Sequence, residues 1–127
     1  MEEAQITVLL VDDNESIRSL LRYEFQMDPR FKIVGEAYDG RSALRAVEME
    51  KPDIVILDLM MPLMDGFHAI PQIQASSPET KILVLTNADV NDAGLEYKGA
   101  HAVRMKEEVL DGYGVTQAAA SLCEDGF

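Results

Sequence analysis

Five polar residues of this 127-residue sequence stand where apolar runs end. Three are carboxylates, one carries a hydroxyl and one an ammonium group. If the apolar runs are parallel strands, their carboxyl ends meet at one edge of a sheet, where open α/β folds bind ligands. We therefore expect these side chains to lie close together. They are Asp12, Asp13, Asp58, Thr86 and Lys106.

Three carboxylates within a few ångströms repel one another by roughly 1–4 kcal/mol per pair at intermediate dielectric. Either protonation of one carboxyl or binding of a divalent cation would relieve the repulsion. Oxygen-only ligands favour a hard cation, and a few carboxylates with water are typical of Mg²⁺. A carboxylate held beside the cation can attack a phosphoryl group. Lys106 would add positive charge there, and Thr86 a hydrogen bond.

Each of these residues also has a purely structural interpretation. An Asp after a strand is more often a turn or helix cap, so Asp12 or Asn14 could simply cap the next helix. Asp58 is harder to explain in this way, because it follows four apolar residues, where an unpaired charge is costly. Lys106 alone would be a solvated side chain, and Thr86 alone a strand residue. The functional interpretation depends on their occurring together at four of five strand ends.

The apolar pattern predicts the elements that position these residues. Five short runs rich in branched residues are typical of strands that are buried on both faces of a parallel sheet. Segments of helical period follow each run, which gives five β-α units with right-handed crossovers. The pattern predicts an α/β fold, a doubly wound five-stranded parallel sheet with helices on both faces. The expected strands are 6–11, 32–37, 54–57, 81–85 and 102–105.

Five helices are expected between and after the strands. The first ends before Pro29, and the second ends at the turn 51–53. Pro71 lies inside the third and should kink or shorten it. Gly94 weakens the fourth, which is marked by apolar residues from 90 to 97. The fifth covers residues 115–122.

Length and charge limit the possible functions. The chain is long enough for one domain, so we expect residues 1–127 to form a single domain. Its formal net charge of −12 disfavours direct binding to nucleic acids and to anionic membranes. One cysteine, Cys123, excludes an internal disulfide, and the acidic start is not a signal peptide. No apolar run approaches the ~20 residues of a membrane span, so we predict a cytoplasmic protein.

The same residues resemble a known family, the response-regulator receiver domains of two-component signalling. The resemblance covers nearly the whole chain and makes 1–127 a single receiver domain. It rests on residues 8–14, on Thr86, on Gly99-Ala100 ahead of Lys106, and most specifically on the nine residues from Asp58 to Gly66. It implies a flavodoxin-like sheet with strand order 2-1-3-4-5.

The resemblance also implies a role for each matching residue. Asp58 would be the phosphoacceptor, taking a phosphoryl group from a phosphohistidine on a sensor histidine kinase or a histidine phosphotransfer protein. Asp13, Asp58 and the backbone carbonyl of Met60 would bind Mg²⁺ directly, and Asp12 would act mainly through a Mg²⁺-bound water. The chain would be a signalling module that assists its own phosphotransfer and dephosphorylation, and not an enzyme.

Lys106 would pair with the phosphoryl oxygens, and Thr86 would hydrogen-bond to them, but three neighbouring positions depart from the family pattern. Asn87 replaces a small residue, Val103 replaces an aromatic, and Glu107 replaces a proline. These departures support an alternative function, a degenerate receiver that acts as a phosphorylation-independent protein-interaction module. If the domain signals, the segment after Thr86 and the weak fourth helix should carry the change.

Overall fold

The computed structural model describes residues 4–58, 66–86, 100–105 and 114–124. Its five strands are all parallel and form one sheet in the order β2-β1-β3-β4-β5, which confirms the predicted order 2-1-3-4-5. Each strand lies within one residue of its predicted bounds. The strands are β1 (Ile6–Val11), β2 (Phe31–Ala37), β3 (Ile54–Asp58), β4 (Lys81–Thr86) and β5 (Ala102–Met105).

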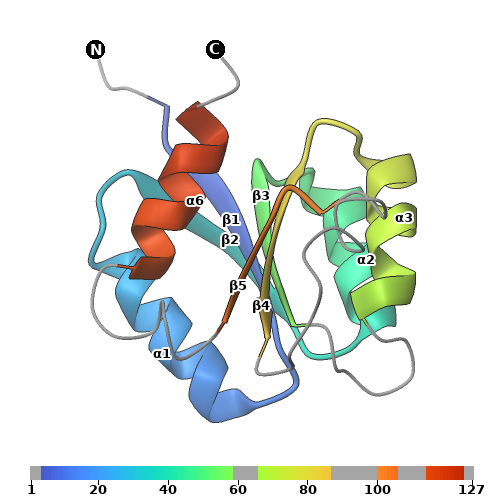
Figure 1. Cartoon of the computed structure of the whole chain (residues 1–127), viewed down its shortest axis with the longest axis horizontal. Helices are drawn as coiled ribbons and strands as arrows, with labels where there is room; N and C mark the ends of the chain where they lie inside the picture. Colours follow the sequence, from blue (N-terminus) through green and yellow to red (C-terminus); the bar gives the residue numbers. More distant parts are fainter. Residues whose placement is uncertain (1–3, 59–65, 87–99, 106–113, 125–127) are drawn as a thin grey trace.

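The helices of the described part cover both faces of the sheet (Figure 1). Helices α1 (Glu15–Gln26) and α6 (Gly114–Glu124) lie on one face, and α2 (Gly40–Glu50) and α3 (Gly66–Ser76) lie on the other. The predicted first, second, third and fifth helices correspond to α1, α2, α3 and α6. The predicted fourth helix, residues 90–97, lies outside the described residues. Pro71 is inside α3, and the helix continues to Ser76.

The pleat of the central strands sorts the apolar side chains into two layers. Alternate residues of β1, β3 and β4 pack with α1 and α6, and the residues between them pack with α2 and α3. In β1, Val8 and Leu10 belong to the first layer, and Leu9 and Val11 to the second. All four side chains are buried. The central parts of these strands, residues 8–11, 54–57 and 82–85, are therefore continuously apolar because both of their faces are covered.

Pairing between β1 and β2 contains one irregularity. Val8 pairs with Ile33, whereas Leu9 pairs with Gly35, so the register shifts by one residue between them. A Cβ atom at Gly35 would lie 3.3 Å from Cδ1 of Leu9. The missing side chain therefore lets β2 approach β1 closely at this bulge.

Helix α2 has well-defined ends. Asp39 Oδ1 accepts a hydrogen bond from Ser42 N at 2.7 Å, and Ser42 Oγ accepts one from Asp39 N at 3.2 Å, so the helix begins with a capping box. At the other end, Lys51 has φ 44° and ψ 58°, a left-handed conformation. The predicted helix stop at 51–53 is confirmed.

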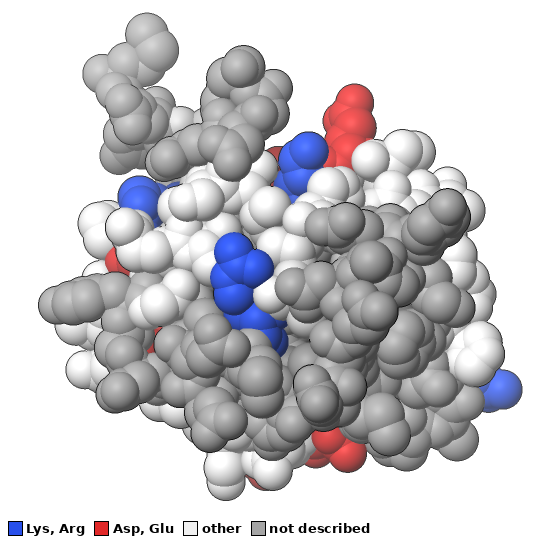
Figure 2. Space-filling view, viewed as in Figure 1, with Lys and Arg blue, Asp and Glu red and all other residues white. Residues whose placement is uncertain are grey.

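Basic and acidic side chains are both visible on the face that Figure 2 shows. Basic ones lie near the middle and also toward the upper, left and right margins, and acidic ones are visible mainly at the upper and lower margins. This arrangement occurs in a chain whose formal net charge is −12. Among the described residues, no helix has the length and apolar character that crossing a membrane requires.

Candidate functional site

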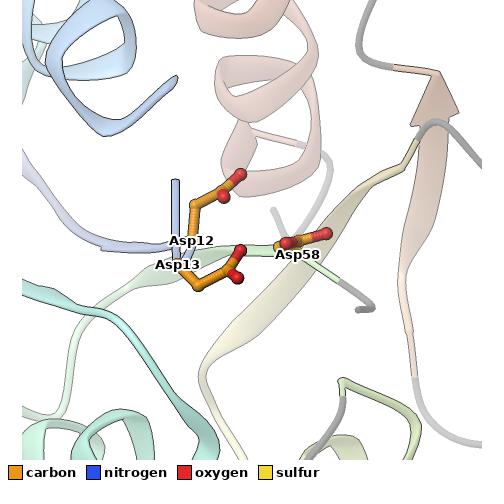
Figure 3. A group of neighbouring side chains, drawn as sticks. All are labelled: Asp12, Asp13 and Asp58. Atoms are coloured by element: carbon orange, nitrogen blue, oxygen red, sulfur yellow. The ribbon is translucent and has the colours of Figure 1, made fainter. Parts of the chain in front are cut away.

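Three carboxylates meet at the carboxyl ends of β1 and β3, where they face the same side (Figure 3). One oxygen each from Asp12, Asp13 and Asp58 lies within 4.8 Å of the others. Asp12 is 2% exposed and Asp58 is 5% exposed, whereas Asp13 is exposed to solvent. The structure thus brings together the three acids that the sequence analysis singled out. We call them the acidic cluster.

Strand register explains why two of these acids are neighbours. Strands β1 and β3 are paired, with Val11 opposite Leu57, so the next residues, Asp12 and Asp58, lie side by side at this edge of the sheet. Because side chains alternate along a strand, both acids point away from the α2 and α3 layer to which Val11 and Leu57 belong. They therefore lie on the side of α1 and α6.

Hydrogen bonds fix the position of Asp12 at three of its atoms. Its N–H donates to Ala37 O at 3.1 Å, and its carbonyl oxygen accepts from Arg18 Nη1 at 2.7 Å. Its carboxylate Oδ1 accepts from Asn14 N at 2.9 Å. The direction of this carboxylate is therefore set by the loop that leads from β1 into α1.

Asn14 is the residue that caps α1. Its Oδ1 accepts from Ile17 N at 3.1 Å, and its backbone is extended, with φ −87° and ψ 114°. Asn14, and not Asp12, is therefore the residue that caps this helix. The acidic cluster lies beside the start of α1, where the helix dipole favours negative charge.

The acidic cluster fits a hard divalent cation. Its donors are all oxygen atoms, and two of the three carboxylates are almost withdrawn from solvent, where their mutual repulsion is least screened. A cation bound between them would remove that repulsion. The exposed carboxylate of Asp13 leaves the cluster open to solvent on one side.

Sequence reasoning missed two residues next to the acidic cluster, Arg18 and Glu36. Arg18 Nε lies 3.3 Å from Glu36 Oε1, and Arg22 donates to both oxygens of the same carboxylate at 2.6 and 2.8 Å. The hydrogen bond from Arg22, together with its charge and with Arg18, holds the pKa of Glu36 below its ordinary value despite partial burial. The four-residue spacing of the two arginines on α1 was the available signal.

Other predicted site residues are only partly described. Thr86 ends β4, one residue beyond Leu85, which pairs with Asp58, so its main chain lies at the expected edge of the sheet. The Thr86 side chain, Met60 and Lys106 lie outside the described part of the structure.

The three departures from the family pattern are also only partly described. Val103 lies in β5, is half-buried, and packs against the layer of α2 and α3. Asn87 and Glu107 lie outside the described residues.

Comparisons with known proteins agree on one family. Residues 8–106 match the family model of the response regulator receiver domain. The transcriptional regulatory protein YhcZ of Bacillus subtilis is 42% identical over 80 residues, which are 63% of this chain and 37% of that protein. A protein-glutamate methylesterase/protein-glutamine glutaminase of Anaeromyxobacter dehalogenans is 40% identical over 97 residues, 76% of this chain and 28% of the relative.

A solved structure is similar over most of its length. It is a chain of the CheX-CheY-BeF3-Mg²⁺ complex from Borrelia burgdorferi, with a TM-score of 0.84 and 27% identity. The match covers 92% of this chain and 88% of that one. By contrast, this chain spans only 24% to 54% of the length of the curated relatives it matches.

The relatives overturn one prediction. The prediction that excluded an enzyme is contradicted by relatives that are 40% and 32% identical and are named protein-glutamate methylesterase/protein-glutamine glutaminases; the matches cover 28% and 24% of those proteins. Transcriptional regulators are also among the relatives. The matching region therefore occurs both in enzymes and in regulators of transcription.

Proposed function

Because the chain belongs to the receiver domains of response regulators in two-component signalling, we propose that it is a switch in which Asp58 accepts a phosphoryl group. The observation that carries this proposal is the acidic cluster. Asp58 ends the central strand β3 and is 5% exposed, with Asp12 and Asp13 beside it. A nearly buried carboxylate beside two others is suited to charge-assisted chemistry and unsuited to a structural turn.

In the proposed reaction, Asp58 is the nucleophile. One of its carboxylate oxygens forms a bond to phosphorus while the P–N bond of a phosphohistidine breaks. The leaving imidazole nitrogen keeps the electron pair of that bond and takes up a proton. The donor would be a sensor histidine kinase or a histidine phosphotransfer protein. Such transfers depend mainly on positioning and on charge neutralisation, which the fixed loop after β1 can support.

The proposed cofactor is Mg²⁺. In this proposal Asp13, Asp58 and the carbonyl of Met60 bind the ion directly, and Asp12 acts through a water molecule. When bound, Mg²⁺ offsets the negative charge on the phosphoryl oxygens. The similar chain from Borrelia burgdorferi was solved with Mg²⁺ and BeF3, which supports this assignment.

Two further residues complete the proposal. The ammonium group of Lys106 pairs with the phosphoryl oxygens, and the hydroxyl of Thr86 donates a hydrogen bond to one of them. The family match extends to residue 106, and Thr86 ends the strand next to that of Asp58. Both facts support these roles.

Phosphorylation by a small donor tests the proposal. We expect acetyl phosphate with Mg²⁺ to add one phosphoryl group to the native chain, measured by intact mass, and EDTA to prevent it. Asp58→Asn should give no adduct. Asp53→Asn is the matched control, because Asp53 lies at the opposite end of β3, where its carboxylate accepts hydrogen bonds from Thr7 N and Oγ1. This variant should still be modified.

Two outcomes would contradict the proposal. An adduct that persists in Asp58→Asn would place the acceptor elsewhere. A folded native chain that gives no adduct would favour the alternative, a phosphorylation-independent interaction module. Among the described residues, Val103 supports that alternative, because it is half-buried against the layer of α2 and α3 where the family has an aromatic residue.

A further inference from the structure

We infer that Arg18 is a positioning residue for the acidic cluster and that Glu36 holds it in place; the inference rests on the proposed Mg²⁺ site. Arg18 belongs to α1, and its side chain is only 16% exposed. Its Nη1 donates to the carbonyl oxygen of Asp12 at 2.7 Å, and its Nε donates to Glu36 Oε1 at 3.3 Å. One guanidinium therefore ties the loop after β1 to the end of β2.

Arg18 acts where regular strand pairing stops. The ladder between β1 and β2 ends one residue before Asp12. The next two N–H groups on the β2 side, those of Tyr38 and Asp39, both donate to Ser42 Oγ. Arg18 supplies a donor to the Asp12 carbonyl from the helix instead of from the neighbouring strand.

Holding this carbonyl orients the next residue as well. The carbonyl of Asp12 and the N–H of Asp13 belong to one planar peptide unit. A donor that fixes the carbonyl therefore fixes the direction in which the chain leaves toward Asp13. Asp13 is the exposed member of the acidic cluster, so its place depends on this main-chain anchor more than on packing. Metal sites lose affinity when such supporting contacts are removed.

Glu36 gives Arg18 a fixed partner that lies outside the acidic cluster. Arg22 donates hydrogen bonds of 2.6 and 2.8 Å to the two carboxylate oxygens of Glu36, so the position of this carboxylate is itself fixed. Without Glu36, the guanidinium of Arg18 would be attracted by the three nearby carboxylates. It would then compete with a cation for the same oxygen atoms.

Isothermal titration calorimetry, which measures the Mg²⁺ affinity of the full chain and its variants, tests the inference. Arg18→Lys keeps the charge but loses the planar fork that reaches two acceptors, so we expect its Mg²⁺ affinity to fall about 10-fold or more. Glu36→Gln should also weaken binding, because Arg18 is released. Arg30→Lys is the matched control: it makes the same change just before β2, at the opposite edge of the sheet, where Arg30 pairs with Asp28 at 2.7 Å, and its affinity should stay within about twofold of native.

Amide NMR spectra of the Mg²⁺-free proteins give a second readout. The Asp13 and Asn14 signals should move in Arg18→Lys and stay in place in Arg30→Lys, with both variants folded by circular dichroism. Equal Mg²⁺ affinities for these two variants, in a native chain that does bind Mg²⁺, would overturn the role of Arg18 and leave the proposed function standing. A native chain that binds no Mg²⁺ would overturn the proposed Mg²⁺ site and, with it, this inference.

Discussion

At the scale of single residues, the two adjacent acids after β1 differ in their surroundings. Asp12 is 2% exposed, and its carboxylate is tied to the N–H of Asn14. Asp13 is exposed to solvent, although one of its oxygens lies within 4.8 Å of those of Asp12 and Asp58. Asp13 is therefore the member of the cluster whose charge can be removed with the least disturbance of the core.

Removing that charge should stabilise the protein when Mg²⁺ is absent. Asp13→Asn eliminates two carboxylate repulsions, and we expect the free energy of unfolding in EDTA to rise by about 1 kcal/mol. The same variant should lose the rise in thermal midpoint that Mg²⁺ gives the native chain. Thermal unfolding with EDTA and with Mg²⁺ measures both effects.

Glu15→Gln serves as the control for this variant. It removes one negative charge from the first turn of α1, outside the acidic cluster. Its response to Mg²⁺ should match that of the native chain. If Asp13→Asn were less stable than native in EDTA, the carboxylates would not be repelling one another as described.

At the scale of elements, the sequence predicted the strands well because burial on both faces leaves a run of apolar residues with no polar interruption. Helix stops were also predictable, as the turn at 51–53 illustrates. The contact of Arg18 with the Asp12 carbonyl was not predictable, because a hydrogen bond from a helix side chain to a main-chain atom outside the helix depends on how α1 packs on the sheet. The hydrogen bond that His101 Nδ1 accepts from Ile82 N at 3.0 Å was not predictable either, because it too depends on packing in the folded chain.

The end of α2 yields a prediction at this scale. Lys51 has a positive φ of 44°, which costs a side-chain-bearing residue about 1–2 kcal/mol relative to glycine. Replacing Lys51 by glycine would remove this cost. Part of the gain in stability would be offset by the greater freedom of glycine in the unfolded chain and by loss of the hydrogen bond from Lys51 Nζ to Ser76 O. We expect Lys51→Gly to raise the free energy of unfolding by about 0.5–1 kcal/mol in urea titrations.

Lys51→Ala is the matched comparison for that variant, because it removes the same hydrogen bond and keeps a Cβ atom in the left-handed conformation. It should be less stable than Lys51→Gly. The reverse order would show that the backbone conformation at this position carries no penalty.

At the scale of the whole molecule, stability should fall with acid in two stages. Burial, and then the charge of Lys81, lowers the pKa of His101 below its ordinary 6.5, and only the neutral ring can accept from Ile82 N. The fold thus favours the neutral ring, and this contribution is complete above pH 6.5 and lost as the pH falls through the lowered pKa.

The second stage of acid destabilisation comes from carboxylates. Hydrogen bonds from Arg22 lower the pKa of Glu36 from its ordinary 4.5, and hydrogen bonds from Arg30 lower that of Asp28 from 3.8. Their contributions are complete above these ordinary values and are lost as the pH falls through the lowered ones. Urea unfolding at a series of pH values should therefore show one loss that begins near 6.5 and another that begins near 4.5.

Two variants of His101 separate the first stage from the second. His101→Asn keeps an oxygen acceptor for Ile82 N without a titrating group, so the loss that begins near pH 6.5 should disappear. His101→Ala leaves that buried N–H without the imidazole and should cost about 1–3 kcal/mol at neutral pH. If both variants kept the first stage, another group would be responsible for it.

The alternation of side chains along β1 has a practical consequence. Leu9 and Leu10 are joined by one peptide bond, yet they belong to opposite layers of the sheet. Isotope-labelled methyl groups on these two leucines would be separate NMR probes: Leu9 for the layer of α2 and α3, and Leu10 for the layer of α1 and α6. A structural change that starts at the acidic cluster and reaches only one face of the sheet would shift the methyl resonance of one leucine and leave that of the other unchanged. The two resonances would therefore show which face of the sheet responds.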